Sequence, residues 1–479
     1  MVKVAFVQKT FYSYFGTMSI SAVLKKNGHE TELFMEFHEK DIADAIKNSR
    51  PDVVAFSCLT ATGEFEWAVE TARKLKAELP NVPIVFGSIH PTLFPEKTIN
   101  ENDVDIICVG EGEIPMLELC SKLAKKPGVS NIPTNIPGLW VKKNGKIYKN
   151  GVGELVEDLD SLPFADRALY DKYHYFDNAT SIDALAGRNC PFNCSFCYSH
   201  VFREMYKGKG KFVRKRSVAN VIEELEEVKA KYSPKFFTFV DELFTLEKTW
   251  LYDFLAQYKK RIGIPFICSV RLDLLTDEMV LNLKNAGCYR VCVGLETGSE
   301  GLRNGILRKN IPNAKLIESA KLLKKHKLKF LTTNMLGLPG ETLEQGFETV
   351  KLNQQIGTDF VWCSVFQPYP LLDITKDMIE KKIIPDADPS CFPTTYFTRS
   401  LLKQKDIEKL VNLHKFFYVA VKFPLTTPII RQLIKLPSNK LFDWVFILSF
   451  GYFQMSYYHR SPLQVLRMGL SNLKIFSEK

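Results

Sequence analysis

The sequence predicts an α/β protein with two parallel sheets in succession, followed by a helical C-terminal region. Short buried runs alternate with amphipathic helical patterns across residues 1–125, and a second alternation of strands and helices occupies residues 176–372. Such alternation places strands side by side in parallel, with helices covering the sheet. The 479 residues match the length of about three domains. We assign residues 126–175 to a connector and residues 373–479 to the helical region.

The first module, residues 1–125, has the pattern of a doubly wound, Rossmann-like domain. Apolar, β-branched runs predict its strands at 3–7, 53–57, 84–87 and 106–109. Amphipathic patterns predict its helices at 17–27, 40–48, 64–78 and 113–123. Such domains bind ligands at the carboxyl ends of their strands, where the strand order reverses. The candidate residues at those ends are Ser57, Leu59, Gly87, Ser88, His90, Gly110 and Glu111.

The connector at 126–175 contains one clear element. Residues 138–148 alternate apolar and polar side chains around Asn144-Gly145, a composition typical of a tight turn between two antiparallel strands. We therefore predict a β-hairpin there.

The second module, residues 176–372, alternates strands and helices. Apolar runs predict strands at 181–186, 235–240, 265–270, 289–295, 328–336 and 359–366. Helical patterns lie between them at 216–232, 247–260, 276–286, 311–326 and 342–356. These units predict a partial (β/α)6 barrel of the TIM type, in which active residues gather at the C-terminal ends of the strands. The loop after the first of these strands carries three cysteines.

Cys190, Cys194 and Cys197 have C-x3-C-x2-C spacing. A 4Fe–4S cluster held by three thiolates keeps one iron open to a substrate or cofactor. Zinc is a weaker interpretation, because its fourth ligand commonly comes from a second pair and His200 has no partner pair. Disulfides fit less well still, since the chain has 11 cysteines, an odd number, and no secretory leader. This usage favours a reduced, cytoplasmic protein.

The spacing, with the aromatic Phe196 before the third cysteine, resembles the signature of radical S-adenosylmethionine (SAM) enzymes. In that family the amine and carboxylate of SAM bind the open iron, and one electron from the cluster releases a 5′-deoxyadenosyl radical. The resemblance implies SAM contacts from the cysteine loop and the strand ends: Phe196 and Tyr198 near the adenine, Asp241 and Glu242 at the amino group, Arg271 at the carboxylate, Glu296 at the ribose, and Leu336 and Gly337 beside the adenine. For each side chain taken alone, packing or a solvated loop charge is the simpler interpretation.

The first module resembles the cobalamin-binding domain that precedes the radical module in the largest radical-SAM subgroup. Ser57 and Leu59 match its S-x-L motif, and Gly87-Ser88 stands where Gly-Gly is usual, so the resemblance implies that the candidate residues at the strand ends contact cobalamin. Classical domains also carry D-x-H-x-x-G with a cobalt-ligating histidine in the first loop. This chain has no histidine between Gln8 and Gly16. Either cobalamin binds without a protein side chain as the lower ligand of cobalt, or the domain has lost cobalamin. Both interpretations remain open.

Residues 401–479 are basic and rich in aromatic side chains, with twelve Lys/Arg against four Asp/Glu. Their uninterrupted apolar stretches, such as 444–448, are far shorter than the roughly 20 residues of a membrane span. Two interpretations remain for this region: helices lying on an anionic membrane surface, or helices capping the barrel. Nucleic-acid binding is not indicated, because the region has no dense Lys/Arg run and no recognisable RNA-binding module.

Together, these resemblances imply a cobalamin-dependent radical SAM enzyme that methylates an unactivated carbon, with a 4Fe–4S cluster, SAM and cobalamin as cofactors. One alternative is a radical oxidative cyclase or carbon-coupling enzyme acting on a lipid or tetrapyrrole, and another is a cobalamin-dependent sensor or scaffold with a vestigial cluster. A tRNA methylthiotransferase would need a second cysteine trio, and Cys58, Cys108 and Cys120 lie in predicted buried elements. We expect a small-molecule or lipid substrate and an electron donor such as flavodoxin or ferredoxin. We expect a cytoplasmic protein, and peripheral attachment to the inner membrane surface remains an open alternative. The sequence assigns no catalytic residue.

Overall fold

The computed structural model describes residues 1–10, 12–60, 63–177, 179–384, 399–458, 461–463 and 465. Part of the basic region predicted at 401–479 therefore lies outside the described residues. The chain divides into two compact units. The first is Met1–Asp177 with Phe202–Arg214, and the second is Asn178–Val201 with Lys215–Lys479.

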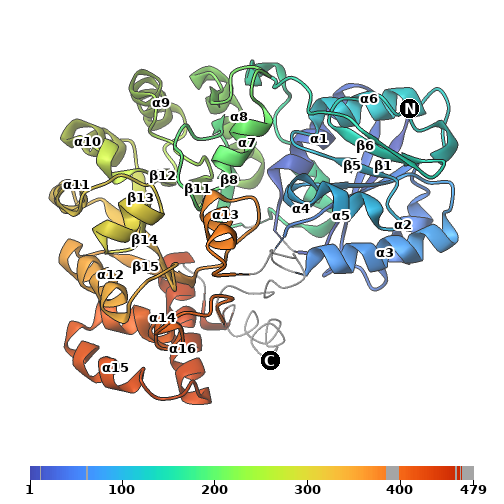
Figure 1. Cartoon of the computed structure of the whole chain (residues 1–479). Helices are drawn as coiled ribbons and strands as arrows, with labels where there is room; N and C mark the ends of the chain where they lie inside the picture. The colour runs from blue at the N-terminus through green and yellow to red at the C-terminus, as the bar shows by residue number, and fades with distance from the viewer. Residues whose placement is uncertain are drawn as a thin grey trace. The chain divides into compact units, whose positions relative to one another are not determined.

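The first unit is built on a seven-stranded sheet, in blue to teal in Figure 1. Its spatial order is β2 (Glu30–Met35), β1 (Lys3–Gln8), β3 (Val53–Ser57), β4 (Ile84–Gly87), β5 (Ile106–Cys108), β6 (Leu139–Lys143) and β7 (Lys146–Lys149). The first five strands are parallel, and β6 and β7 are antiparallel additions at the edge. The chain direction across the sheet reverses between β1 and β3, which is the switch point where doubly wound sheets bind ligands.

Helices cover both faces of this sheet (Figure 1). They are α1 (Phe15–Lys26) and α6 (Glu113–Leu123) on one face, and α2 (Ile42–Ser49), α3 (Glu64–Glu78) and α5 (Pro95–Asn100) on the other. Shorter helices complete the unit: α4 (Ile89–Leu93) and the 3-10 turns η1 (Val129–Asn131), η2 (Leu159–Ser161) and η3 (Arg167–Tyr173). The core between α2, α3, α5 and the sheet is aliphatic and aromatic, with Phe56 stacked on Phe86. The predicted doubly wound domain is confirmed.

Two features of this unit differ from the sequence prediction. Strand β2 was not predicted, because its first three residues, Glu30-Thr31-Glu32, are polar and only its last three are buried. The predicted hairpin is present, with Asn144 and Gly145 both at positive φ as a type I′ turn requires. Its strands β6 and β7 do not stand apart as a connector, because they extend the first sheet beyond β5.

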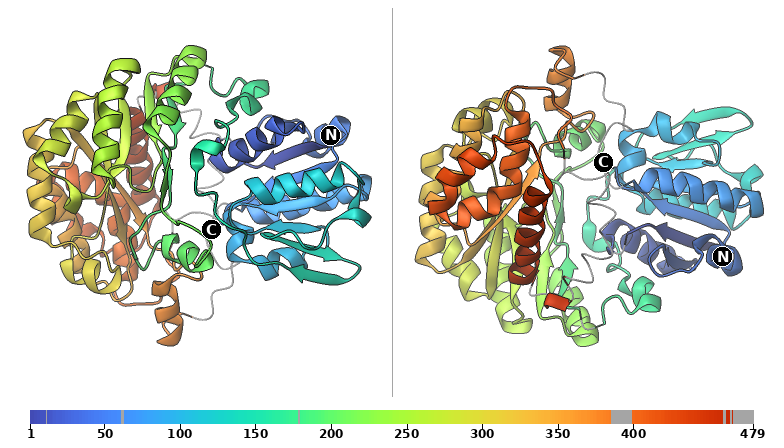
Figure 2. Two further views of the ribbon diagram at one scale, coloured as in Figure 1. Left: turned by 90° about the horizontal axis from the view of Figure 1, so that it is seen from above. Right: turned by 90° about the horizontal axis from the view of Figure 1, so that it is seen from below.

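The second unit is a curled sheet of six parallel strands, which confirms the predicted partial barrel (Figures 1 and 2). Its order is β15 (Phe360–Val365), β14 (Lys329–Leu336), β13 (Cys288–Glu296), β12 (Phe266–Val270), β11 (Phe236–Phe239) and β8 (Ser181–Ala184). The outer helices are α8 (Val218–Tyr232), α9 (Lys248–Arg261), α10 (Asp277–Asn285), α11 (Asn313–Lys325) and α12 (Leu343–Ile356). Small elements join them: β9 (Gly187–Arg188), α7 (Ser199–Met205), β10 (Arg214–Lys215), η4 (Leu272–Leu274) and the π-turn η5 (Leu302–Ile306).

Local sequence signals explain why these boundaries fall within two residues of the prediction. Thr342 caps α12 with a complete capping box through Gln345, and Gly357 ends the same helix in the left-handed conformation. Ser217 caps α8 and Thr276 caps α10, each through its side-chain oxygen. These caps place the loops at the carboxyl ends of the strands.

The C-terminal region is helical, as predicted. It comprises α13 (Asp373–Glu380), α14 (Ile407–Lys422), the turn η7 (Pro424–Thr426), α15 (Thr427–Leu433) and α16 (Lys440–Tyr458). Helix α14 packs beside α12 on the outer face of the sheet and supplies the sixth outer helix. Helix α16 packs on the opposite face, against Leu331 and Phe360 at the amino ends of their strands. Among the described helices, none has the length and apolarity to cross a bilayer.

Candidate active site

The three cysteines lie on the loop that joins β9 to α7, and none forms a disulfide. Two serines within the loop hold its shape. The buried Ser195 donates from its hydroxyl to the Ile306 carbonyl at 2.6 Å, and Ser199 donates to the Cys190 carbonyl at 2.8 Å. A further bond closes the turn between the last two cysteines, from the Cys197 amide to the Cys194 carbonyl at 3.2 Å. The loop therefore presents three free thiols in a defined backbone.

The electrostatic environment of the thiols is mixed. Loss of solvation raises the pKa of all three, and it raises that of Cys197 to about 11. The ammonium of Lys309 and the guanidinium of Arg271 act in the opposite direction and lower the pKa of Cys194. The thiolate form in such a partly buried place needs positive charge beside it, which bound iron supplies.

Three thiols are the number that a 4Fe–4S cluster with one open iron requires. Among the described residues, no three His, Cys, Asp or Glu side chains converge as the ligands of one metal ion do. A 4Fe–4S cluster needs a wider arrangement, because each thiolate binds a separate iron. Three free thiols on one pinned loop fit that requirement and leave the fourth iron without a protein ligand.

Arg271 follows β12 and braces the cysteine loop from the side. Its guanidinium carbon lies 3.8 Å from the centre of the Phe192 ring, between the first two cysteines, and its Nη1 lies 4.0 Å from Cys194 Sγ. The same side chain contacts Asp273 at 2.9 Å and donates to the Lys309 carbonyl at 2.6 Å. Sequence reasoning expected Arg271 to meet the SAM carboxylate. The structure gives it four protein contacts that hold the loop, and the SAM contact stays a prediction.

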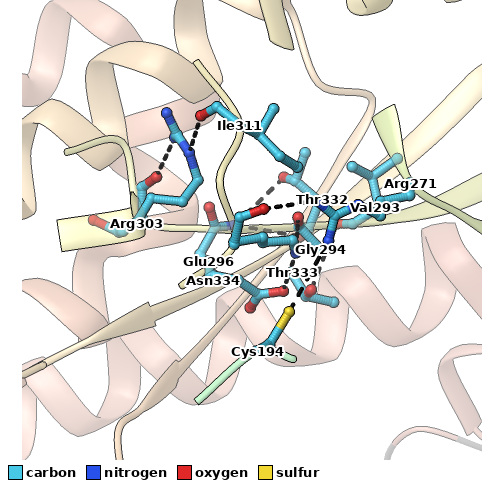
Figure 3. A network of polar contacts seen from close by, with 12 residues as sticks. Cys194, Arg271, Val293, Gly294, Glu296, Arg303, Ile311, Thr332, Thr333 and Asn334 are labelled. Atoms are coloured by element: carbon cyan, nitrogen blue, oxygen red, sulfur yellow. Dashed lines mark hydrogen bonds and ion pairs between the residues drawn. The ribbon is translucent and has the colours of Figure 1, made fainter. Parts of the chain in front are cut away.

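Glu296 ends β13 beside Cys194, in the network shown in Figure 3. Its Oε1 lies 2.9 Å from Lys309 Nζ, and Lys309 also donates to the Gly294 carbonyl. A register shift at this point turns Glu296 to a φ of 70°, which is unusual for a residue with a side chain. Gly294 has no side chain because an added Cβ would overlap both charged groups. The pair uses one carboxylate oxygen of Glu296 and leaves the other for the predicted ribose contact.

The position of Lys309 depends on Arg303, a fully buried side chain that sequence reasoning missed (Figure 3). Arg303 donates to the Thr297 carbonyl at 2.8 Å and to the Ile311 carbonyl at 2.9 Å, and it also contacts Asn313. These bonds tie the two ends of the segment that contains Lys309 to each other. Burial lowers the pKa of Arg303 to about 10, so it stays charged at neutral pH.

The two acids after β11 have different surroundings. Asp241 is buried, accepts from the Ala186 amide at 3.0 Å and pairs with Lys215 at 3.3 Å. Glu242 is exposed, and its carboxylate is near enough to the cysteine loop to raise the pKa of Cys190 and of Cys197. Loss of solvation raises the pKa of both carboxyls, and the neighbouring charge of Asp241 adds to the rise at Glu242. Asp241 is engaged by Lys215, whereas Glu242 accepts a backbone hydrogen bond from Asn189, and its contact with the SAM amino group stays a prediction.

The loop after β14 is held by a buried carboxyl. Glu341 accepts the amides of Gly337 at 2.5 Å and Leu338 at 3.0 Å through one oxygen, and its other oxygen has no hydrogen-bond partner. Burial raises the pKa of Glu341 to about 8. Gly337 has a φ of 81° there, whereas Leu336 is fully buried beneath it. Gly337 can thus offer backbone to an adenine, and Leu336 contributes packing.

Phe196 and Tyr198 are half-buried on the cysteine loop and pack against a hydrophobic cluster that includes Met335 and Phe366. Met335 precedes the Gly337 loop, so both aromatic rings lie near that loop. Burial raises the pKa of the Tyr198 hydroxyl, with a smaller contribution from Tyr369. The position suits either packing or an adenine contact, as the sequence indicated.

In the first unit, the predicted cobalamin residues gather at the carboxyl ends of three adjacent strands. Ser57 and Gly87 are register partners across β3 and β4, and Gly110 follows the next strand, β5. Ser88 has a φ of 83°, a conformation that favours glycine. The Leu59 amide donates to the buried Glu64 at 2.8 Å. Small residues and open backbone at a topological switch point fit a large flat cofactor.

Glu111 and His90 are engaged within the unit. Glu111 forms a two-point pair with the fully buried Arg214, and its amide donates to the Tyr206 hydroxyl at 2.6 Å. Gly110 is required there because an added Cβ would overlap the Tyr206 ring. His90 is 2% exposed, its ring centre lies 4.0 Å from that of Phe65, and neither ring nitrogen has a hydrogen-bond partner. Burial lowers the pKa of His90 to about 4.

Comparison with known proteins follows the division into two units. The family model of the B12 binding domain matches residues 4–120, and that of the radical SAM superfamily matches residues 185–352. A Pyrococcus horikoshii protein named uncharacterized methyltransferase PH0819 is 31% identical over 336 residues, which cover 69% of this chain and 70% of the relative. The chain belongs to the cobalamin-binding radical SAM enzymes.

Two further proteins are similar to this chain. The anaerobic magnesium-protoporphyrin IX monomethyl ester cyclase of Rubrivivax gelatinosus is 25% identical over 85% of this chain and 74% of that protein. The radical SAM methyltransferase TsrM from Kitasatospora setae, solved with cobalamin and a [4Fe-4S] cluster, has a TM-score of 0.66 at 17% identity. That match covers 81% of this chain and 79% of TsrM, and it shows that the fold is shared.

The sequence predicts that the cysteine loop holds the cluster and that the strand ends around it hold SAM. The structure brings Cys194, Arg271, Glu296 and Lys309 into one network. Phe192, Lys309, Arg303 and Glu341 were missed by sequence reasoning, since the folded loops, and no sequence motif, determine what each side chain contacts. Cys58, Cys108 and Cys120 are buried, with pKa values raised by that burial, which suits packing.

Proposed function

We propose that this enzyme transfers a methyl group from SAM, by way of cobalamin, to an unactivated carbon of its substrate. The observation that carries the proposal is the presence, in one chain, of a B12-binding domain and a free three-cysteine loop, matched over 336 residues by a relative that is named a methyltransferase. When bound, the cluster supplies the electron that cleaves SAM and cobalamin supplies the methyl-carrying metal. The balanced net reaction replaces one C–H bond of the substrate with a C–CH3 bond. It consumes two SAM and two electrons and yields methionine, 5′-deoxyadenosine and S-adenosylhomocysteine.

The residues of the second unit have separate tasks in this proposal. Cys190, Cys194 and Cys197 hold the cluster, and Arg271 keeps their loop in shape through Phe192. Glu242 meets the SAM amino group. Glu296, fixed by Lys309, accepts the ribose hydroxyls through its remaining oxygen.

The first unit would hold cobalamin at the strand ends without a protein imidazole on cobalt. His90 is enclosed between Phe65 and Phe94 and is 2% exposed, so it would have to leave the core to reach a ligand. Ser57, Gly87 and Gly110 instead offer small side chains and backbone to the nucleotide tail. We propose a low-potential donor such as flavodoxin or ferredoxin as the source of electrons.

The test needs no knowledge of the substrate. Protein reconstituted with iron, sulfide and hydroxocobalamin under reductant is given SAM labelled at the methyl carbon, without oxygen. Methyl transfer predicts S-adenosylhomocysteine together with label in the corrin fraction, and radical initiation predicts 5′-deoxyadenosine. The triple variant Cys190→Ala/Cys194→Ala/Cys197→Ala should lose 5′-deoxyadenosine and retain corrin binding. Wild-type protein that forms 5′-deoxyadenosine and moves no label would contradict methyl transfer and retain the radical chemistry.

The second candidate is a radical oxidative cyclase. It is favoured by the 25% identity to the Rubrivivax gelatinosus cyclase, which extends over a larger share of this chain than the methyltransferase match does. A cyclase predicts 5′-deoxyadenosine with no methyl label leaving SAM, so the same experiment separates the two.

A further inference from the structure

Helix α16 presents two apolar faces, and only one of them is packed. Phe442, Phe453 and Tyr457 are buried against the rest of the second unit. The other face carries an apolar stripe with spacing of three and four residues, which places its members on one side of a helix. The stripe consists of Leu441 (68% exposed), Trp444 (60%), Leu448 (68%) and Tyr452 (56%).

Contacts on the packed face prevent α16 from rotating about its axis to bury the stripe. Arg290 donates to the Tyr457 carbonyl at 2.6 Å and lies 3.5 Å from the centre of the Tyr457 ring, while Trp362 contacts Phe453. These contacts fix the rotation of α16 about its axis. The stripe is therefore a built feature of the surface, since burying it would expose an aromatic cluster of similar size.

The charges in the described C-terminal region are mostly positive. Residues 399–458 contain nine Lys/Arg and three Asp/Glu. The single acid of α16, Asp443, is neutralised by Lys415 at 2.6 Å, and Asp406 is paired with Lys409 at 2.7 Å. Lys435 and Lys440 are exposed in the segment that leads into the stripe, next to the exposed Leu436.

We propose that the α16 stripe, with Lys435 and Lys440, docks this protein on an anionic lipid surface. Tryptophan, tyrosine and leucine flanked by lysine suit the boundary between headgroups and acyl chains. A second copy of the chain is the poorer occupant, because pairing two such faces would bring two basic regions together. The attachment is peripheral.

Helix α16 runs beside β15. Phe453 and Tyr457, near its C-terminus, pack with Leu331 and Phe360 at the amino ends of their strands, whereas Phe442, near its N-terminus, joins the cluster that contains Leu336 at the carboxyl end of β14. None of the four stripe residues is among the predicted cluster or SAM contacts. The proposal is thus independent of the reaction, and its test uses no turnover.

The experiment is flotation of the full-length protein with vesicles. Phosphatidylcholine vesicles are compared with vesicles that also contain about 30% phosphatidylglycerol, at low salt and at about 0.5 M salt. The wild type should float with the anionic vesicles at low salt and mostly stay behind with the neutral ones. The variants Trp444→Ser/Leu448→Ser and Lys435→Glu/Lys440→Glu should each bind at least about tenfold more weakly.

The matched control is Leu281→Ser/Lys284→Glu, which changes an exposed leucine and lysine on α10. It should float like the wild type, and circular dichroism should show all three variants folded. Absence of wild-type flotation with anionic vesicles, or equal loss in the control, would overturn the proposal. So would a wild-type dimer in light scattering that Trp444→Ser/Leu448→Ser converts to a monomer, since the face would then bind a second copy.

Discussion

Glu341 makes the stability of the second unit depend on pH in a direction opposite to that of most carboxyls. The side chain is 2% exposed, and one of its oxygens lacks any hydrogen-bond partner, so the charged form is poorly solvated. Burial raises its pKa from 4.5 to about 8 in the folded protein, whereas the unfolded chain keeps the ordinary value. Between these values the folded state binds the extra proton. The contribution of Glu341 to the free energy of unfolding is therefore fully present below about pH 4.5, and it is lost as the pH rises toward about 8.

The size of the effect follows from the two pKa values. One pH unit of separation corresponds to about 1.36 kcal/mol, which gives a loss on the order of 5 kcal/mol across the interval. Glu341→Gln keeps an oxygen for the amides of Gly337 and Leu338 and cannot ionise. We expect this variant to lose much less stability than the wild type between about pH 5 and about pH 8.

Urea denaturation followed by circular dichroism at several pH values measures the difference. Subtracting the variant from the wild type at each pH removes the contributions of all other titrating groups, provided that both unfold alike. A difference that stays constant within about 1 kcal/mol from pH 5 to pH 8 would refute the reasoning. It would mean that water or a local rearrangement solvates the carboxylate in the folded state.

Two other predictions concern packing next to the sites. Gly294→Ala should destabilise the second unit by about 1 to 3 kcal/mol and weaken SAM binding, because the added Cβ would overlap Lys309 and Glu296. The control is Gly305→Ala, where an added Cβ meets nothing within 4 Å; thermal unfolding measures the stability of both variants, and isothermal titration measures their affinity for SAM. Arg214→Met should lower the stability of the first unit by about 3 kcal/mol by leaving Glu111 without its partner. Arg214→Met/Glu111→Gln should recover part of that loss in the same thermal assay, and a double variant no more stable than Arg214→Met would speak against the pair.

Much of the fold was legible in the sequence because its elements are signalled locally. Each barrel strand was predicted from an apolar run and each outer helix from its period, and the caps at Thr342 and Ser217 show why the helices begin where the pattern predicts. Strand β2 was missed because edge strands need only one apolar half, and Glu30-Thr31-Glu32 has the composition of a loop. The hairpin was predicted, but its attachment to the first sheet depends on β5, more than thirty residues away in the chain.

The candidate site divides in the same way between features with a local sequence signal and features that depend on tertiary contacts. The cysteine spacing is a property of eight consecutive residues, so it predicted the cluster loop and indicated, by resemblance, the family. The partners of the surrounding charges come from distant segments, as in the pairing of Glu296 with Lys309 and of Asp241 with Lys215. Sequence reasoning treated Asp241 and Glu242 alike. Burial separates them, because one faces Lys215 inside the barrel and the other faces solvent.

The sequence by itself determined the order of the two modules, the thiol trio and the carboxyl-end loops, since each is encoded in contiguous residues with a characteristic period or spacing. Only the tertiary structure decided which charges are occupied by protein partners and which remain for ligands. It also decided that α16 keeps an apolar stripe in solvent, because the rotation of that helix is set by Arg290 and Trp362 on other strands. Contacts between segments far apart in the chain carry no local signature, and they determine what each exposed group can bind.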